Sequence, residues 1–212
     1  MVAGKEKYAP NVEFSEDLAE IIGIILGDGN VFSYVQRGKG IAVRGVSIAF
    51  HGDEESYFFR VRALLLSVFG EKASRVEHKT RNARYLRLYG KGYVELFTAL
   101  GLPPGNKITN NVTIPDWIFS NKSWLRACIR GLIDTDGSVY RTGRWTQICF
   151  RNHNPALLAD TRRGLLKLGI FTSQITRRKI YVSRKHALRK LFNEIGFRNY
   201  KHESRFVQYI AP

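Results

Sequence analysis

The chain carries one short motif twice. Residues 21–31 and residues 129–139 each form an apolar, helix-like segment with small residues four positions apart, and each segment ends in Asp-Gly and runs into a strand-like stretch. A single Asp-Gly after a helix is an ordinary turn. A second copy with matching surroundings indicates internal duplication. The repeat therefore restricts the chain to a fold built from two similar halves.

The segments that follow the two motifs also correspond in order. Each half continues with two strand-like runs, a helix-like segment, a short hairpin and a last helix that ends at a glycine. We expect strands over 31–36 and up to 51, a helix over 54–69, a hairpin over 75–89 and a helix over 92–100, and then strands over 139–141 and up to 151, a helix over 155–168, a hairpin over 173–182 and a helix over 186–195. This order predicts an α+β fold of two pseudo-symmetric αββαββα repeats, residues 1–115 (with the linker) and 116–212.

Composition sets the broad class. Hydrophobic residues make up 44% of the chain and the mean hydropathy is −0.24, as expected for a globular protein with a substantial core. We see no membrane span and no secretion signal in the short polar segment 1–11, so we expect an intracellular protein of a prokaryotic cytoplasm or an organelle. Cys128 and Cys149 have no metal-binding or disulfide spacing and are expected in the core.

Charge is the second constraint on function. The formal net charge is +16, with 15 basic and 12 acidic residues in 1–115 against 19 and 6 in 116–212. An excess of this size indicates a polyanionic partner, and the arginine clusters at 141–144, 177–179 and 184–185 lie in or beside predicted strands. A membrane surface would call for a basic amphipathic helix, and none stands out. Nucleic acid is therefore the expected partner.

The two motifs predict a particular contact between the halves. Gly23 with Gly27, and Gly131 with Thr135, would let the two motif helices approach closely along one face. Ser15 is a plausible N-cap of the first helix, and Asn121 or Ser123 of the second. Close packing would bring the helix ends together.

The helix ends carry the candidate chemistry. Asp28 and Asp136 would then lie side by side at the negative ends of two helix dipoles, where two unpaired carboxylates repel. A hard divalent cation such as Mg²⁺ would make this arrangement favourable and would support phosphodiester hydrolysis. Lys107 and Lys201, which follow the last helix of each half, would supply positive charge to the phosphorus centre.

Residues 23–29 and 131–137 resemble the two signature motifs of the LAGLIDADG homing endonucleases in their single-chain, two-repeat form, and the match extends over nearly the whole chain. The resemblance implies that Asp28 and Asp136 bind catalytic Mg²⁺, or another divalent cation such as Mn²⁺. It also implies that the backbone carbonyls of Gly27 and Thr135 ligate the metal. Lys107 and Lys201 would complete the catalytic pocket.

One position departs from the family pattern. Leu26 stands in the first motif where the second has Asp134, and we interpret that position as a helix-end hydrogen-bonding residue without a catalytic role. The asymmetry also raises the prospect of unequal cleavage of two DNA strands. His51 and Arg151 occupy matching positions and are candidates for orienting water or phosphate, although solvated side chains are an equally good interpretation.

The resemblance further implies that four strands in each half form a saddle in the major groove of a long, imperfectly palindromic DNA duplex, which a pseudo-twofold monomer cuts across the minor groove to leave short 3′ overhangs. Two-stranded ribbons fit this groove, where Arg and Gln read bases. By alternation the candidates for DNA contact are Tyr34, Gln36, Arg37, Arg44, Arg81, Arg84, Arg87, Tyr140, Arg144, Trp145, Gln147, Arg177 and Lys179.

Three functions remain open from the sequence. The first is a metal-dependent, site-specific DNA endonuclease, intron-encoded or free-standing rather than part of an intein, because no splicing-type N-terminal Cys or C-terminal His-Asn is present. The second is a non-cleaving binder on the same scaffold, either a transcription regulator or an intron maturase with intron RNA as a partner. The third is a basic RNA-binding structural protein, although no RNA-recognition motif is visible. Retention of Asp28, Asp136, Lys107 and Lys201 favours the enzyme.

Overall fold

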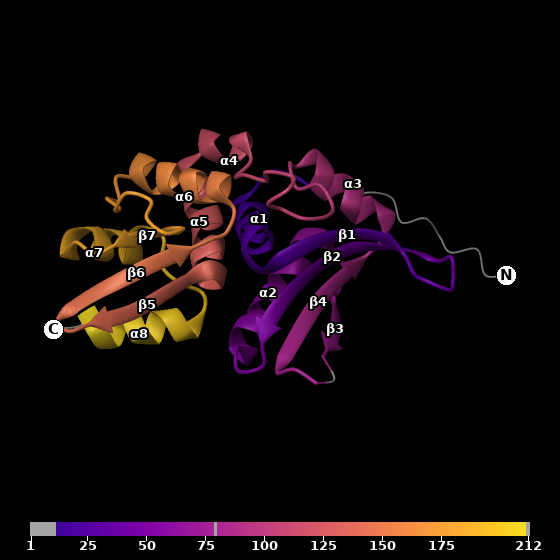
Figure 1. The fold of residues 1–212 in the computed structure, drawn as a ribbon, viewed down its shortest axis with the longest axis horizontal. Coiled ribbons are helices and arrows are strands. Elements are labelled where there is room, and N and C mark those ends of the chain that lie inside the picture. The colour runs from indigo at the N-terminus through magenta and orange to yellow at the C-terminus, as the bar shows by residue number, and fades with distance from the viewer. Residues whose placement is uncertain (1–11, 79, 211–212) are drawn as a thin grey trace.

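The computed structural model describes residues 12–78 and 80–210, so the short polar segment 1–11, in which no secretion signal was seen, lies outside the described part of the chain. The first half follows the expected order (Figure 1). Its elements are α1 (Glu16–Asp28), β1 (Gly29–Val35), β2 (Ala42–His51), α2 (Glu55–Phe69), β3 (Ser74–Glu77), β4 (Ala83–Tyr89) and α3 (Lys91–Ala99).

The second half repeats this order with three differences: a short extra helix at its start, one named strand fewer and a further helix at its end. Its elements are α4 (Asp116–Ser120), α5 (Lys122–Asp136), β5 (Gly137–Thr142), β6 (Trp145–Arg151), α6 (Pro155–Lys167), β7 (Lys179–Val182), α7 (Lys185–Glu194) and α8 (Tyr200–Ile210). The predicted hairpin over 173–182 forms only one named strand within the described residues, because its first arm joins by an isolated bridge between Thr176 and Lys179. The expectation of four strands in each half is therefore wrong for the second half. Helix α8 was not expected from the sequence.

The motif helices begin where the sequence indicates. The side chain of Ser15 accepts a hydrogen bond from the backbone N–H of Leu18 and caps α1. Asn121, rather than Ser123, caps α5, because its Oδ1 accepts from the backbone N–H of Ser123 at 2.8 Å. Each side chain satisfies one of the N–H groups that the first helical turn leaves unpaired.

Helices α1 and α5 cross in direct backbone contact. A Cβ on Gly23 would lie 2.0 Å from the carbonyl oxygen of Cys128, and one on Gly131 would lie 2.5 Å from that of Glu20. A Cβ on Gly27 would meet Oγ1 of Thr135 at 2.0 Å. The expectation that these small residues permit close helix packing is therefore confirmed.

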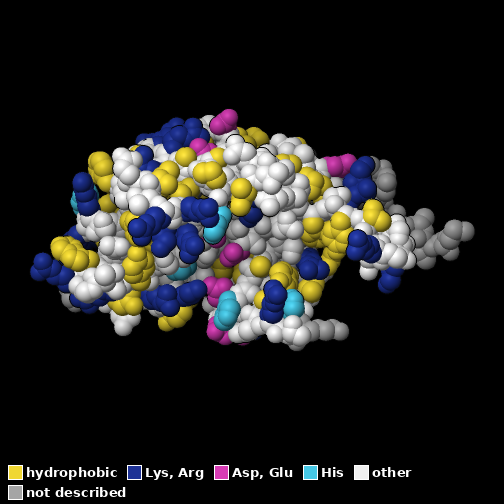
Figure 2. Space-filling model, in the orientation of Figure 1, with side chains coloured by type: hydrophobic (Ala, Val, Ile, Leu, Met, Phe, Trp, Pro, Cys, Tyr) yellow, Lys and Arg dark blue, Asp and Glu magenta, His cyan; other side chains and the backbone are white. Residues whose placement is uncertain are grey.

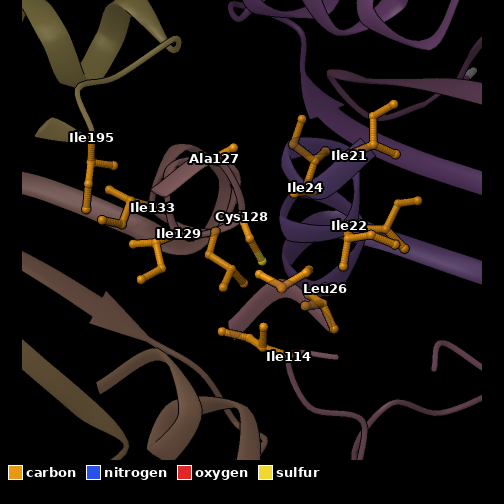
Figure 3. Close-up of a cluster of buried hydrophobic side chains, with 14 of the residues drawn as sticks. Ile21, Ile22, Ile24, Leu26, Ile114, Ala127, Cys128, Ile129, Ile133 and Ile195 are labelled. Atoms are coloured by element: carbon orange, nitrogen blue, oxygen red, sulfur yellow. The ribbon is translucent and has the colours of Figure 1, made fainter. Parts of the chain in front are cut away.

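The space on either side of the crossing is filled by apolar side chains (Figure 3). Ile21, Ile24 and Leu26 of α1 are completely buried, as is Cys128 of α5, which points toward α1 as the sequence predicted for a core cysteine. Arg130 of α5 donates from Nε to Oε2 of Glu20 at 3.0 Å, so one ion pair is also enclosed between the helices. The core of the molecule thus runs continuously across the junction of the halves.

Each half contributes one antiparallel sheet. The strand order is β1-β2-β4-β3 in the first and β5-β6-β7 in the second. Alternate residues such as Val31, Ile48 and Leu86 are buried against helices, and the intervening residues form an open face. The same alternation holds for Val139 and Ile148 in the second sheet. In the part of the chain that the structure covers, no helix is long and apolar enough to span a membrane.

Candidate functional site

Helices α1 and α5 bring Asp28 and Asp136 close together, at the junction of the two sheets. Both aspartates are the last residues of their helices, and neither helix has a basic residue in its last turn. Burial raises the pKa of Asp28 to about 6, and the negative charge of Asp136 contributes to this rise, although the residue as a whole keeps contact with solvent. Two carboxyl groups whose charges oppose each other in this way form a site that favours a cation.

Asp136 is held in place by a neighbour from its own half. Nδ2 of Asn152 donates to Oδ2 of Asp136 at 2.6 Å. Burial raises the pKa of Asp136, whereas this hydrogen bond and the charge of Lys107 act in the opposite direction. The hydrogen bond orients one carboxylate oxygen and leaves the other available.

Lys107 lies between the two aspartates and the end of α1. Its Nζ donates to the carbonyl oxygens of Ile25 at 3.1 Å and Leu26 at 2.7 Å, and also to that of Gly27. Burial lowers the pKa of Lys107, and the charges of Asp136 and Asp28 partly restore it. The lysine therefore caps the negative end of the helix dipole while it faces both carboxylates.

Lys201 is placed differently. It lies in the first turn of α8, and its Nζ is 3.5 Å from Oε1 of Glu54, the residue that precedes α2 in the other half. Its charge lowers the pKa of Asp28, so the lysine is near enough to act on that carboxyl group. The structure thus gathers Asp28, Asp136, Lys107 and Lys201 around one centre.

Leu26 and Asp134 occupy the same position in the two motifs, and their difference explains part of the different placement of Lys107 and Lys201. Oδ2 of Asp134 accepts from the backbone N–H of Arg198 at 2.9 Å, and its carbonyl accepts from Nδ2 of Asn199 at 3.1 Å. Burial raises the pKa of Asp134 to about 7. The expected helix-end hydrogen bonds of Asp134 are confirmed. In the first half Leu26 has no side-chain acceptor, and Nζ of Lys107 donates to the backbone carbonyl oxygen of Leu26.

His51 and Arg151 end β2 and β6 at matching positions. Nδ1 of His51 lies 3.3 Å from the carboxylate of Asp53, and both residues are exposed. Arg151 lines a pocket of about 190 Å³ that also contains Asp136, Asn152 and Lys107. His51 lines a separate pocket with Glu54 and Lys201, and the roles of Arg151 and His51 both stay predictions.

The donors at this centre suit a hard divalent cation. Two carboxylates with an adjacent helix-end carbonyl, that of Gly27, offer oxygen ligands only, and Mg²⁺ commonly takes one or two carboxylates together with water and substrate phosphate. Among the described residues no group of three His, Cys, Asp or Glu side chains forms a closed metal cage. The observation that fits a bound cation is the repulsion between the charges of Asp28 and Asp136. The backbone carbonyl oxygen of Gly27 already accepts a hydrogen bond from Nζ of Lys107.

The open face of the first sheet forms a groove that begins at Asp28. The groove has a volume of about 300 Å³. Asp28 lies at one end, and the lining continues along β1, β2 and β4 through Asn30, Phe32, Tyr34, Ser47, Ala49, Tyr85 and Arg87. Of the predicted contact residues of this half, Tyr34 and Arg87 extend from this face.

Two of the predicted contact residues lie on the other face. Arg44 pairs with Ser33 and Arg84 pairs with Phe50, so the register puts both on the side that the helices cover. Arg84 also lies 3.4 Å from the carboxylate of Glu55 in α2. Their assignment to the open face is therefore wrong, because Arg84 and Arg87 are three residues apart and a strand alternates every second residue. Gln36, Arg37 and Arg81 lie in turns beyond the strand ends and are exposed.

In the second sheet the predicted residues share one face more consistently. Tyr140 pairs with Gln147 across β5 and β6, and its hydroxyl donates to Oε1 of Gln147 at 3.2 Å. Trp145 and Lys179 follow the same alternation. Arg144 and Arg177 lie in the connecting turns, and the guanidinium of Arg144 stacks 5.1 Å from the ring of Trp145. Lys and Arg side chains gather over this half, with acidic and His side chains between the halves (Figure 2).

Sequence reasoning missed several residues of the site. Asn30, Phe32, Ser47 and Tyr85 line the groove, and strand alternation from Tyr34 would have found the first two. Asn152 contacts Asp136, and Glu54 contacts Lys201. Both residues lie in the loops that follow β2 and β6, and the only sequence signal for these loops was their matching position in the two repeats.

Comparison with known proteins agrees with this geometry. Residues 123–196 match the family model of the LAGLIDADG-like domain. The fold matches that of mesophilic variants of the homing endonuclease I-DmoI (TM-score 0.63, 20% identity, 85% of this chain and 95% of that chain). It also matches the LAGLIDADG meganuclease I-AabMI bound to uncleaved DNA (TM-score 0.59, 12% identity, 93% and 90%). Similar structures include I-DmoI in complex with DNA and Mn and with DNA and Ca.

Two curated relatives share a segment with this chain. The tRNA-splicing ligase RtcB of Methanopyrus kandleri is 30% identical over 146 residues, and the tRNA-splicing ligase RtcB of Pyrococcus furiosus is 29% identical over 137 residues. The matches cover 62% and 58% of this chain but only 14% and 13% of those proteins, so the likeness does not carry RNA ligation to this chain. Residues 123–196 thus match a LAGLIDADG-like domain, and the chain has the same α+β fold as the LAGLIDADG homing endonucleases.

Proposed function

We propose that the protein is a site-specific, metal-dependent DNA endonuclease that acts as a monomer and cuts both strands of a long, pseudo-palindromic duplex. The observation that carries the proposal is the convergence of Asp28 and Asp136 at the open ends of α1 and α5, with Lys107 and Lys201 beside them. A protein that only binds nucleic acid has no need for two mutually repelling carboxylates at the negative ends of two helices.

The open faces of the two sheets supply the DNA-binding surface in this proposal. Tyr34 and Arg87 in one half, and Tyr140, Gln147 and Lys179 in the other, would contact the major groove or its phosphates. The net charge of +16 supports a duplex as partner, and the excess of basic residues in 116–212 favours more phosphate contacts by that half.

At the centre, Asp28 and Asp136 would hold Mg²⁺ or Mn²⁺, with the carbonyls of Gly27 and Thr135 as further donors. A bound divalent ion would activate water and stabilise the leaving oxygen of a phosphodiester. Asn152 fixes the orientation of Asp136. Lys107 and Lys201 would offset negative charge at the scissile phosphates. Cutting across the minor groove, with short 3′ overhangs, is part of the proposal by analogy with the family.

Cleavage of a randomised duplex library tests the proposal. Wild-type protein with Mg²⁺ or Mn²⁺ should select and cut a defined sequence of DNA. Asp28→Asn and Asp136→Asn should each abolish double-strand cutting and leave binding in Ca²⁺ within a few-fold of the wild type. Asp17→Asn, at the exposed start of the same helix as Asp28, serves as the matched control and should cut normally.

Two results would contradict the proposal. Normal cutting by both site variants would remove the assigned centre. A wild-type protein that selects a sequence without cutting it in any divalent ion would instead be a binder, as expected of a transcription regulator or an intron maturase.

A further inference from the structure

The two halves differ at one pair of matching positions beside the proposed centre. Glu54 precedes α2 and Asn154 precedes α6, each three residues after the end of the preceding strand. Both side chains reach across to the opposite half: Asn154 to the segment that follows α3, and Glu54 to the end of the α7–α8 connection and the first turn of α8. One is a carboxylate and the other a neutral amide.

The side chain of Asn154 contacts only backbone carbonyl groups in the segment around Lys107. Its Nδ2 donates to the carbonyl oxygen of Val112 at 2.6 Å and to that of Lys107 at 3.3 Å, and its Oδ1 caps α6. The ammonium group of Lys107 is bound by neutral carbonyl oxygens at the end of α1. Lys107 is therefore oriented while it keeps its positive charge toward Asp28 and Asp136.

Glu54 contacts the ammonium group of the opposite lysine directly. Its Oε2 accepts from the backbone N–H of His51 at 3.1 Å, and its Oε1 accepts from Nδ2 of Asn199 at 3.0 Å. The same oxygen lies 3.5 Å from Nζ of Lys201. Burial alone would raise the pKa of Glu54, but these partners lower it below its ordinary value, so the group is a carboxylate at neutral pH. The Glu54 side chain is only 17% exposed, whereas that of Lys201 is 49% exposed.

We propose that Glu54 is a positioning residue that restrains Lys201 and makes the two halves of the centre unequal. Because Glu54 is fixed by His51 and Asn199, Lys201 must leave it to meet a phosphate, and its charge is partly neutralised until then. Lys107 is held by neutral carbonyl oxygens instead, so no carboxylate in direct contact offsets its charge in this way. The strand that depends on Lys201 is therefore cut after the strand that depends on Lys107. This inference rests on the proposed nuclease function.

The test measures the two strands separately on the duplex selected by the wild type. Lys107→Met and Lys201→Met first identify the strand that each lysine serves. Glu54→Gln removes the charge and keeps one acceptor oxygen, which can accept from the backbone N–H of His51 or from Nδ2 of Asn199 but not from both. It should speed cutting of the Lys201 strand by about two- to five-fold, the range expected for a partly exposed ion pair, and leave the other strand unchanged.

Glu55→Gln is the matched control. Glu55 also pairs with a basic side chain, Arg84, but on the face of the sheet away from the groove. It should change neither strand. Glu54→Asn, which copies the residue type of the other half, is a second variant if Glu54→Gln does not fold.

A metal-free binding measurement gives an independent readout. Released from Glu54, Lys201 should add about one phosphate contact, so Glu54→Gln should tighten duplex binding and steepen its salt dependence by about one unit, and Glu55→Gln should not. Slower cutting of the Lys201 strand would make Glu54 a participant in catalysis and overturn the proposal, as would an equal effect on both strands or none. If the wild type cuts no duplex at all, the nuclease function itself fails, and the strand order fails with it.

Discussion

At the scale of single residues, the energetic cost of the site is concentrated on Asp28. Burial and the neighbouring Asp136 raise the pKa of Asp28 from 3.8 to about 6. The folded protein therefore binds a proton between these values that the unfolded chain has already released. Stability from this group declines as the pH rises from about 4 to about 6 and stays reduced above that range.

Asp28→Asn should therefore stabilise the metal-free protein at pH 7, because the amide removes the repulsion, and should change it little near pH 4. The measurement is the melting temperature at both pH values in the presence of a chelator. Asp17→Asn should show no such pH-dependent gain. A loss of stability of Asp28→Asn at pH 7 would mean that the carboxylate is not strained in the absence of metal.

At the scale of elements, the α1–α5 crossing depends on the absence of side chains. The helices touch through backbone atoms at Gly23 and Gly131, and apolar residues close the gap on either side. Any Cβ at these positions forces the helices apart and shifts Asp28 relative to Asp136. The geometry of the centre and the stability of the core are thus set by the same contact.

Gly23→Ala should cost about 3 kcal/mol or more in the free energy of unfolding, because the new methyl would meet rigid backbone. Urea denaturation would measure the loss. Gly164→Ala should cost less, since that Cβ would meet the movable Cδ1 of Ile129 at 2.8 Å. Equal losses for the two variants would argue against backbone contact at the crossing.

Strand β4 offers a test of which sheet face binds the duplex. Arg87 lines the groove, and Arg84 lies on the covered face of the same strand. Arg87→Ala should weaken DNA binding and reduce its salt dependence by up to about one unit, whereas Arg84→Ala should leave both unchanged. Filter binding or fluorescence anisotropy over a salt series would decide. Similar effects of the two variants would place the duplex elsewhere.

At the scale of the whole molecule, we propose residues 1–115 and 116–212 as two lobes that depend on each other. The crossing buries Ile24 and Cys128 completely, and the hydrogen bonds of Asn154 and Asn199 tie each lobe to the other. The lobes also differ in charge, so the duplex would be held unevenly.

The two lobes expressed separately should therefore expose the α1 or α5 face and aggregate or bind a hydrophobic dye. Co-expression should yield a soluble one-to-one complex. Gel filtration and dye fluorescence would measure this outcome. Cooperative unfolding of either lobe by itself would show that the crossing is not required for folding.

Local patterns were enough to predict much of this protein. The duplication, the order of the elements, the caps at Ser15 and Asn121 and the small residues of the motif helices are all visible in short stretches of sequence. The convergence of Asp28 and Asp136 followed from these features, because two helices that pack closely through small residues near their C-terminal ends bring those ends together.

Only the tertiary structure decided the remaining features. The register alone determined that Arg87 faces the groove and Arg84 does not, since a shift of one residue exchanges the two faces of a strand. The first arm of the 173–182 hairpin stayed outside the sheet, and α8 brought Lys201 to Glu54 from far along the chain. The contact between Lys201 and Glu54 depends on how the two halves dock, and no sequence pattern within either half encodes that arrangement.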